Sequence, residues 1–294
     1  MQIGANGIRL EVEDHGSPAG VPLVLIMGLG MQLVAWHEDF VARLVSHGFR
    51  VIRFDNRDIG LSQRFDEFGV PNLTKDAFKH AFGLSVASPY RIADMADDTA
   101  ALLDVLGLRA AHICGASMGG MIAQHLAVRH PQRVRSLTLM MTTSGSRRLP
   151  GPTLKVRTAM FSRPDDPRSV DSVIAHYVRL YRLIGSPGYP ANDAYLNDRL
   201  GLSVRRSYHP RGVARQLVAI ASDGDRSPLL ARIKAPTQII HGLQDPLVPV
   251  EAGRDLARRI DGARIDLIDG MGHDLPVPLW PRFVEGIRSA AARA

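Results

Sequence analysis

The sequence has only one cysteine in 294 residues, Cys114. A single thiol excludes a disulfide within the chain and a zinc site built from cysteines, and it is typical of proteins of the reducing cytoplasm. The chain also lacks any run close to the roughly 20 apolar residues that cross a bilayer. Residues 1–15 lack the basic start and apolar centre of a signal peptide. We therefore expect a cytoplasmic protein without a membrane span.

Glutamate is absent from residues 145–228, where 14 Lys and Arg residues stand against 7 Asp residues. The rest of the chain has equal numbers of acidic and basic residues, so this segment carries the whole net charge of +7. It has no basic run interleaved with aromatic residues and no nucleic-acid recognition motif. We expect no nucleic-acid partner. A solvated basic surface is the preferred interpretation, and attraction of acidic substrates is the alternative.

Apolar runs of strand length alternate with amphipathic helices over most of the chain. Such runs occur at residues 22–27, 49–55, 111–114, 136–141, 237–242 and 264–269. The helical periodicity between them is clearest at residues 36–47, 92–106, 118–130, 251–260 and from 279 onward. This alternation predicts an α/β fold with a parallel sheet covered on both faces. The Asn6-Gly7 pair additionally predicts a β-hairpin at the start of the chain.

The alternation is interrupted by a proline-rich segment with helical pieces, residues 145–228. Its best helix places Val170, Val173, Ile174 and Tyr177 on one face. We therefore expect a core formed by residues 1–144 and 229–294, with residues 145–228 inserted as a helical cap (lid).

Three polar side chains of complementary chemistry follow the ends of separate predicted strands. These are Ser117 after residues 111–114, Asp245 after residues 237–242 and His273 after residues 264–269. Sites in open parallel sheets form at the carboxyl ends of strands. A serine hydroxyl is a weak nucleophile until an imidazole accepts its proton, and a carboxylate holds that imidazole in the correct tautomer. The pattern predicts a Ser–His–Asp catalytic triad.

Ser117 lies in the pentapeptide Gly-Ala-Ser-Met-Gly, residues 115–119, at a predicted strand-to-helix turn. This G-x-S-x-G pattern is typical of a strained turn that exposes the serine oxygen. The backbone N–H of Met118 opens the following helix, and the turn at residues 28–30 offers the N–H of Leu29. We predict that these two amides form an oxyanion hole. The predicted chemistry needs neither a metal nor a cofactor.

Other residues compete for these roles and are less well placed. His112 and His241 lie within predicted strands, where a structural role is preferred. Asp266 lies inside a strand as well, while Asp269 and Asp274 are too close in sequence to His273. A dinucleotide site at residues 28–33 is excluded, because position 33 is leucine instead of the third glycine that the fingerprint needs.

These motifs resemble the α/β-hydrolase superfamily, in particular a serine esterase branch that includes aclacinomycin methylesterase-like proteins. The similar stretches are IMGLGMQLVAWHEDF (26–40), FDNRDIGLSQ (54–63), ASDGDRSPLL (221–230), HGLQDPLVPVEAG (241–253) and GMGHDLP (270–276). The resemblance implies an α/β-hydrolase fold with a mostly parallel eight-stranded sheet. It also assigns the same roles: nucleophile Ser117, acid Asp245, base His273, and oxyanion amides Leu29 and Met118. Many relatives have His-Gly where this chain has Met27-Gly28.

Together these features predict a serine carboxylesterase that cleaves small to medium carboxylic esters through an acyl-enzyme. Its expected partner is a small-molecule ester, and the oligomeric state is left open. Two alternatives share the same residues. One is a C–C bond hydrolase or a cofactor-free perhydrolase with the same triad, and the other is a ligand receptor that binds in a hydrolase pocket without turnover.

Overall fold

One eight-stranded sheet forms the centre of the computed structural model, which describes residues 1–294. The strands are β1 (Gln2–Ala5), β2 (Ile8–His15), β3 (Val21–Ile26), β4 (Phe49–Phe54), β5 (Ala111–Ala116), β6 (Val134–Met140), β7 (Thr237–Gly242) and β8 (Arg264–Ile268). Their order in the sheet is β1-β2-β4-β3-β5-β6-β7-β8. Strands β3 to β8 run parallel, and β2 pairs antiparallel with both β1 and β4. The predicted α/β fold with a mostly parallel eight-stranded sheet is confirmed.

The predicted hairpin joins β1 to β2. Asn6 and Gly7 have φ angles of 51° and 74°, so both central residues of the turn are left-handed. This is the backbone of a type I′ turn, which fits the twist of the flanking strands. The two strands pair in register from Gln2 opposite Glu11 to Ala5 opposite Ile8.

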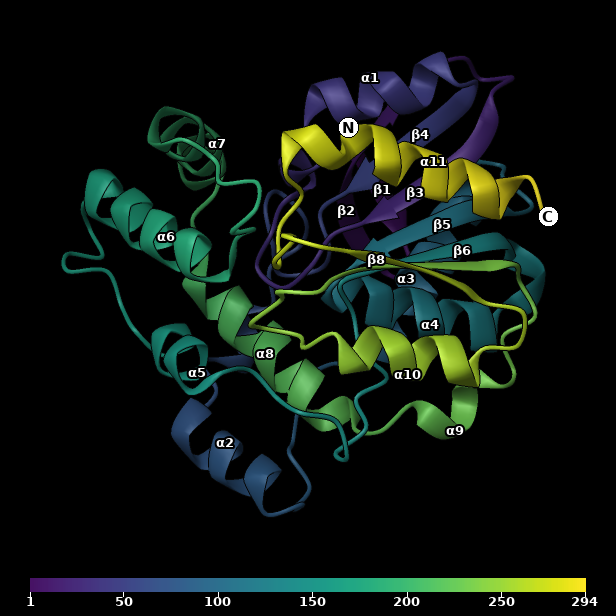
Figure 1. Ribbon diagram of the computed structural model, residues 1–294. Helices are drawn as coiled ribbons and strands as arrows, with labels where there is room; N and C mark the ends of the chain where they lie inside the picture. The colour runs from purple at the N-terminus through teal and green to yellow at the C-terminus, as the bar shows by residue number, and fades with distance from the viewer.

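Helices cover both faces of the sheet (Figure 1). One face carries α1 (Glu38–Ser46) and α11 (Trp280–Ala291), and the other carries α3 (Ile92–Val105), α4 (Met118–Arg129) and α10 (Glu251–Arg259). Each face buries its own apolar cluster, of 34 residues around α3 and α4 and of 21 residues around α1 and α11. The prediction of a helix from residue 36 was wrong at its start, because Trp36 ends a short 3₁₀ turn and α1 begins two residues later.

Five helices lie between β6 and β7: α5 (Leu154–Met160), α6 (Val170–Ile184), α7 (Asp193–Arg206), α8 (Pro210–Asp223) and α9 (Ser227–Leu230). Figure 1 shows α5 to α8 gathered beyond one end of the sheet. Helices α6 and α7 bury a separate apolar cluster of six residues between them. No helix combines the length and the apolar character needed to cross a membrane.

One α-helix was not anticipated from the sequence, α2 (Leu73–Ala81). It packs beside α8, and none of its residues is buried. Four short 3₁₀ helices complete the structure: Leu33–Ala35, Asp66–Phe68, Pro131–Arg133 and Val277–Leu279.

Candidate active site

Ser117 lies on a sharp turn between β5 and α4. Its φ and ψ are 54° and −119°, a region that side-chain-bearing residues rarely occupy. Two hydrogen bonds hold the turn: the Ser117 N–H donates to the Met140 carbonyl at 2.9 Å, and the Thr142 hydroxyl donates to the Ser117 carbonyl at 2.7 Å. The strain is thus maintained by the neighbouring strand β6. The geometry is that of a nucleophile elbow.

His273 and Asp245 lie beside this serine. The Nε2 atom of His273 is 3.0 Å from the Ser117 hydroxyl oxygen, and its Nδ1 atom is 2.7 Å from Asp245 Oδ2. A carboxylate only accepts hydrogen bonds, so Nδ1 carries the proton and Nε2 is free to accept one from Ser117. Asp245 is buried, and its Oδ1 accepts from the N–H groups of Leu247 and Val248 at 2.9 and 2.8 Å.

The competing acids lie elsewhere. Asp266 pairs with Arg282, Asp269 accepts from Gln244, and Asp274 accepts from the Ser186 hydroxyl. None of them contacts the imidazole of His273, although Asp274 is its neighbour in the chain. Asp245 is the acid that the fold brings to the histidine.

The two other histidines considered in the sequence are held by neighbouring groups. His112 is 2.7 Å from the Ser136 hydroxyl, and burial lowers the pKa of its imidazole to about 4. His241 donates from Nε2 to the Val248 carbonyl at 2.8 Å, so Nε2 carries the proton. Burial lowers the pKa of His241 as well. No group of three or more His, Cys, Asp and Glu side chains is placed to hold a metal ion.

The loop carrying Leu29 passes directly against Ser117. A methyl group on Gly28 would lie 3.1 Å from the Cβ of Ser117, so the backbone at Gly28 lies close against the serine and leaves little room for a side chain. Leu29 and Ser117 line the same cavity. Met118 is the first residue of α4, where a backbone N–H has no acceptor within the helix. Neither amide has a hydrogen-bond acceptor in the protein.

The direction of the Leu29 N–H is fixed by three hydrogen bonds around it. The Met31 N–H donates to the Gly28 carbonyl at 3.2 Å, and the two ends of a trans peptide point in opposite directions. The Asn56 side chain donates to the Met27 carbonyl at 2.9 Å, and the Gln216 side chain accepts from the Gly30 N–H at 2.9 Å. The Leu29 amide therefore sits in a short segment that is held on both sides.

Sequence reasoning missed Asn56 and Gln216. Asn56 lies just beyond the end of β4, so the strand-end rule that found the triad could have found it too. Gln216 lies in the middle of α8, and nothing in its local sequence distinguishes it from a solvent-facing glutamine. It is fully buried.

The loop carrying His273 is attached to the end of α6. The His273 N–H donates to the Ile184 carbonyl at 2.7 Å, and the Gly272 N–H donates to the Ser186 hydroxyl at 2.9 Å. The residues that follow α6 thus set the position of the imidazole.

A cavity of about 980 Å³ opens onto Ser117. Its walls come from the sheet side through Leu29 and Met121, and from α8 through Leu217 and Ile220. Its size is within the range of small-molecule sites, and its apolar walls suit a ligand with hydrocarbon character.

The sequence profile of the alpha/beta hydrolase fold family matches residues 21–277 of this chain. Among characterised proteins, the rhodomycin D methylesterase of Streptomyces sp. (strain C5) is 30% identical over 291 residues, covering 92% of this chain and 90% of the relative. The 2-hydroxymuconate semialdehyde hydrolase of Pseudomonas sp. (strain CF600) is 27% identical, covering 100% of this chain and 94% of the relative.

Solved structures give the same result for the fold. The enol-lactonase from Burkholderia xenovorans LB400 superimposes with a TM-score of 0.76 at 24% identity, covering 99% of this chain and 100% of that protein. This likeness shows a shared fold. The profile match and the identity to the methylesterase show that the sequence is related as well. The chain belongs to the alpha/beta hydrolase fold family.

Proposed function

We propose that this protein is a serine hydrolase that cleaves carboxylic esters of small to medium acyl chains through an acyl-enzyme. The single observation that carries the proposal is the chain of contacts from Ser117 through His273 to Asp245, at 3.0 and 2.7 Å. The similarity to rhodomycin D methylesterases supports an ester as substrate.

In the first step, the Ser117 oxygen attacks the ester carbonyl carbon while its proton passes to Nε2 of His273. The imidazolium that forms is stabilised by Asp245, which already accepts the Nδ1 proton. The carbonyl oxygen gains the negative charge, and the N–H groups of Leu29 and Met118 stabilise it. Each such donor is worth about 3 kcal/mol in acyl transfer.

Collapse of this intermediate breaks the bond to the alkoxy group, which takes the proton from His273 and leaves as an alcohol. Water then attacks the acyl-enzyme carbonyl while His273 accepts a proton from it. The second intermediate collapses by breaking the bond to Ser117, whose oxygen recovers the proton. The products are a carboxylic acid, an alcohol and the starting enzyme.

Residues 145–228 act in this proposal as the cap of a core formed by residues 1–144 and 229–294. The support is local: Leu217 and Ile220 of α8 and Met160 of α5 line the cavity above Ser117. We place the protein in the cytoplasm, as the single cysteine favours.

The test is hydrolysis of p-nitrophenyl acetate, butyrate and octanoate by wild type, Ser117→Ala and Ser222→Ala. Ser222 lines the same cavity and serves as the matched control. Loss of the nucleophile is expected to lower kcat by roughly 10⁶-fold, whereas Ser222→Ala is expected to retain activity. Ester hydrolysis by Ser117→Ala at the wild-type rate would refute the proposal. A burst of one equivalent without further product would indicate a receptor instead.

Hydrolysis of a carbon–carbon bond is the second candidate, favoured by the similarity to a 2-hydroxymuconate semialdehyde hydrolase. Both reactions can use the same triad, so geometry at Ser117 does not separate them. Assay of 2-hydroxymuconate semialdehyde beside p-nitrophenyl butyrate does. We expect the higher kcat/KM for the ester.

A further inference from the structure

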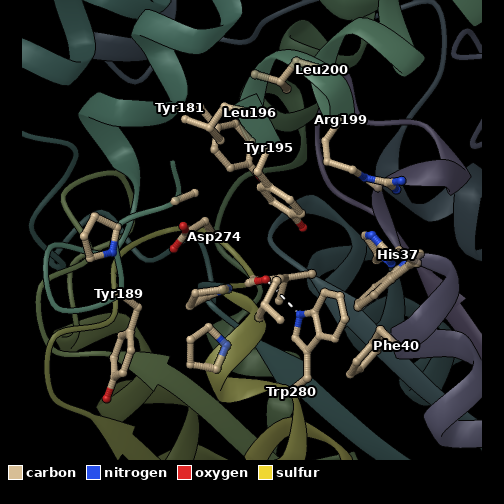
Figure 2. A pocket seen from close by; sticks show the side chains of 18 of the residues that line it. His37, Phe40, Tyr181, Tyr189, Tyr195, Leu196, Arg199, Leu200, Asp274 and Trp280 are labelled. Atoms are coloured by element: carbon tan, nitrogen blue, oxygen red, sulfur yellow. Dashed lines mark hydrogen bonds between the residues drawn. The ribbon is translucent and has the colours of Figure 1, made fainter. Parts of the chain in front are cut away.

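A second cavity, of about 410 Å³, lies between α1, α7 and the loop that follows His273. It shares no lining residue with the cavity at Ser117. Figure 2 shows its arrangement, with Tyr195 and Trp280 facing each other across the hollow and Asp274 and His37 on the two remaining sides. The volume is sufficient for a compound of one ring and a short side chain.

Asp274 is unusual among the buried carboxylates of this protein. Six Asp side chains are buried, and five have a basic partner within 4 Å. The pairs are Asp55 with Arg206, Asp58 with Arg215, Asp98 with Arg57, Asp245 with His273 and Asp255 with Arg259. Asp274 has no ion-pair partner, and Ser186 is the only residue that hydrogen-bonds its carboxylate. A buried carboxylate is stabilised by a cation, and the protein provides none here.

The two basic residues on the cavity wall are accounted for by other contacts. Arg199 pairs with Glu38 at 3.1 Å and also donates to the Val34 carbonyl. His37 stacks on Tyr195, and burial together with the Arg199 charge lowers the pKa of its imidazole, which disfavours the charged form. The uncompensated charge of this cavity is therefore negative, at Asp274. Burial raises the pKa of the Asp274 carboxyl, and the hydrogen bonds from Ser186 and the charge of His273 offset this only in part.

The remaining wall is rich in aromatic rings. The ring centroids of His37 and Trp280 are 5.0 Å apart, and those of Phe40 and Trp280 are 6.0 Å apart, so these rings form one continuous face. Tyr181 and Tyr195 of the helices α6 and α7 form the opposite side. Aromatic faces attract both other rings and cations, and an ammonium group over Trp or Tyr gains most where water is excluded.

We propose that this cavity is a second ligand site that binds an arylalkylammonium compound, with the ammonium group paired to Asp274 and the ring packed against Trp280 and Tyr195. The site is separate from the proposed catalytic cavity and does not depend on Ser117. The ammonium group of the ligand supplies the cation that the buried Asp274 carboxylate lacks.

The chain has two tryptophans, Trp36 and Trp280, and both line this cavity. Intrinsic tryptophan fluorescence therefore reports directly on its occupancy. The experiment titrates the full-length protein with 2-phenylethylamine, with 2-phenylethanol as the neutral compound of equal size and 3-phenylpropionate as the anionic one. We expect the amine to bind about tenfold more tightly than the alcohol, and the anion to bind most weakly.

Two variants test the assignment. Asp274→Asn is expected to remove the preference for the amine over the alcohol, while Asp269→Asn, an exposed carboxylate on the same loop, is expected to keep it. Ala191→Phe places a ring in the cavity and is expected to weaken binding of all three compounds. This variant tests the site even if Asp274→Asn does not fold. Equal affinities for amine and alcohol in the wild type, a preference that survives in Asp274→Asn, or no fluorescence change with any compound would overturn the proposal.

Discussion

Gln216 of α8 accepts a hydrogen bond from the Gly30 N–H at 2.9 Å and donates one to the Arg57 carbonyl at the same distance. A helix that lies between β6 and β7 in the chain thus holds the peptide that follows Leu29. Val213, one turn earlier on α8, limits the space beside Gly30, since a methyl group on Gly30 would lie 3.2 Å from a Val213 methyl. In the proposed mechanism, α8 therefore positions the oxyanion hole as well as covering the cavity.

Removing this contact is expected to slow the reaction more than it weakens substrate binding. Gln216→Leu leaves the Gly30 N–H without an acceptor, so the Leu29 amide loses its fixed direction. Because an oxyanion donor acts mainly in the transition state, kcat is expected to fall roughly ten- to hundredfold with KM little changed. Steady-state kinetics on p-nitrophenyl butyrate measures both.

Two further variants separate positioning from a general loss of structure. Gln216→Glu retains an acceptor oxygen for Gly30 and is expected to keep more activity than Gln216→Leu. Arg211→Gln changes an exposed residue of the same helix and is expected to behave as wild type. An unchanged kcat in Gln216→Leu would contradict the positioning role. A fall in kcat/KM that comes entirely from a higher KM would contradict it too.

Asp245 can be tested by a change that keeps its shape. Asp245→Asn replaces a group that only accepts with one that also donates, so Nδ1 of His273 no longer has to carry the proton. The wrong tautomer then places a proton on Nε2, which cannot accept from Ser117. We expect kcat to fall about 10⁴-fold. Asp269→Asn, an exposed acid 24 residues further along the chain and outside the triad, is the control, and it is expected to retain the wild-type rate.

The contacts among Ser117, His273 and Asp245 could be predicted from sequence because each residue follows a strand, and parallel strands bring their carboxyl ends together. Ser117 lies 156 residues before His273 in the chain, and Asp245 lies 28 residues before it, yet the sheet order places β5, β7 and β8 near one another. Hydrophobic runs were sufficient to locate these strands. The contacts between the three side chains then follow from topology.

Contacts made by α8 could not be predicted in the same way. Gln216 and Arg215 are both fully buried, although a polar pair on a helix ordinarily faces water. Their burial depends on how α8 packs across the loop after β4. The sequence pattern of α8 does not predict this packing. Helix α2 was missed for the related reason that it lies at the surface with none of its residues buried.

The ion pair between Asp58 and Arg215 joins α8 to the loop after β4 and is fully buried. Arg215 contacts both oxygens of Asp58, at 2.7 and 2.8 Å. Asp58→Ala would leave a buried guanidinium without its main partner, so we expect the free energy of unfolding to fall by about 3 to 5 kcal/mol. Urea denaturation measures the change.

The exposed pair of Asp193 and Arg182 provides the comparison. Exposed ion pairs contribute about 1 kcal/mol or less, so Asp193→Ala is expected to leave the urea midpoint almost unchanged. If the two variants lose the same stability, burial does not determine the strength of the Asp58 contact, and the prediction is wrong.

His112 provides a prediction for stability against pH. Burial is the main cause that lowers the pKa of its imidazole from 6.5 to about 4 in the folded protein. The unfolded chain therefore binds a proton at His112 between these two pH values, whereas the folded chain does not. Its contribution to stability is fully present above pH 6.5 and is lost progressively as the pH falls toward 4. The loss amounts to about 3 kcal/mol at most.

The variant His112→Asn isolates this effect from other titrating groups. Asparagine keeps a polar atom near the Ser136 hydroxyl, which is 2.7 Å from His112 Nδ1, but it does not take up a proton. We expect the free energy of unfolding of the variant to depend less steeply on pH between 6.5 and 4 than that of the wild type, with the two slopes equal above this window. His47→Asn, at an exposed position, is expected to leave the slope unchanged. Equal slopes for wild type and His112→Asn below pH 6.5 would mean that the buried imidazole is protonated in the folded protein as easily as in the unfolded chain.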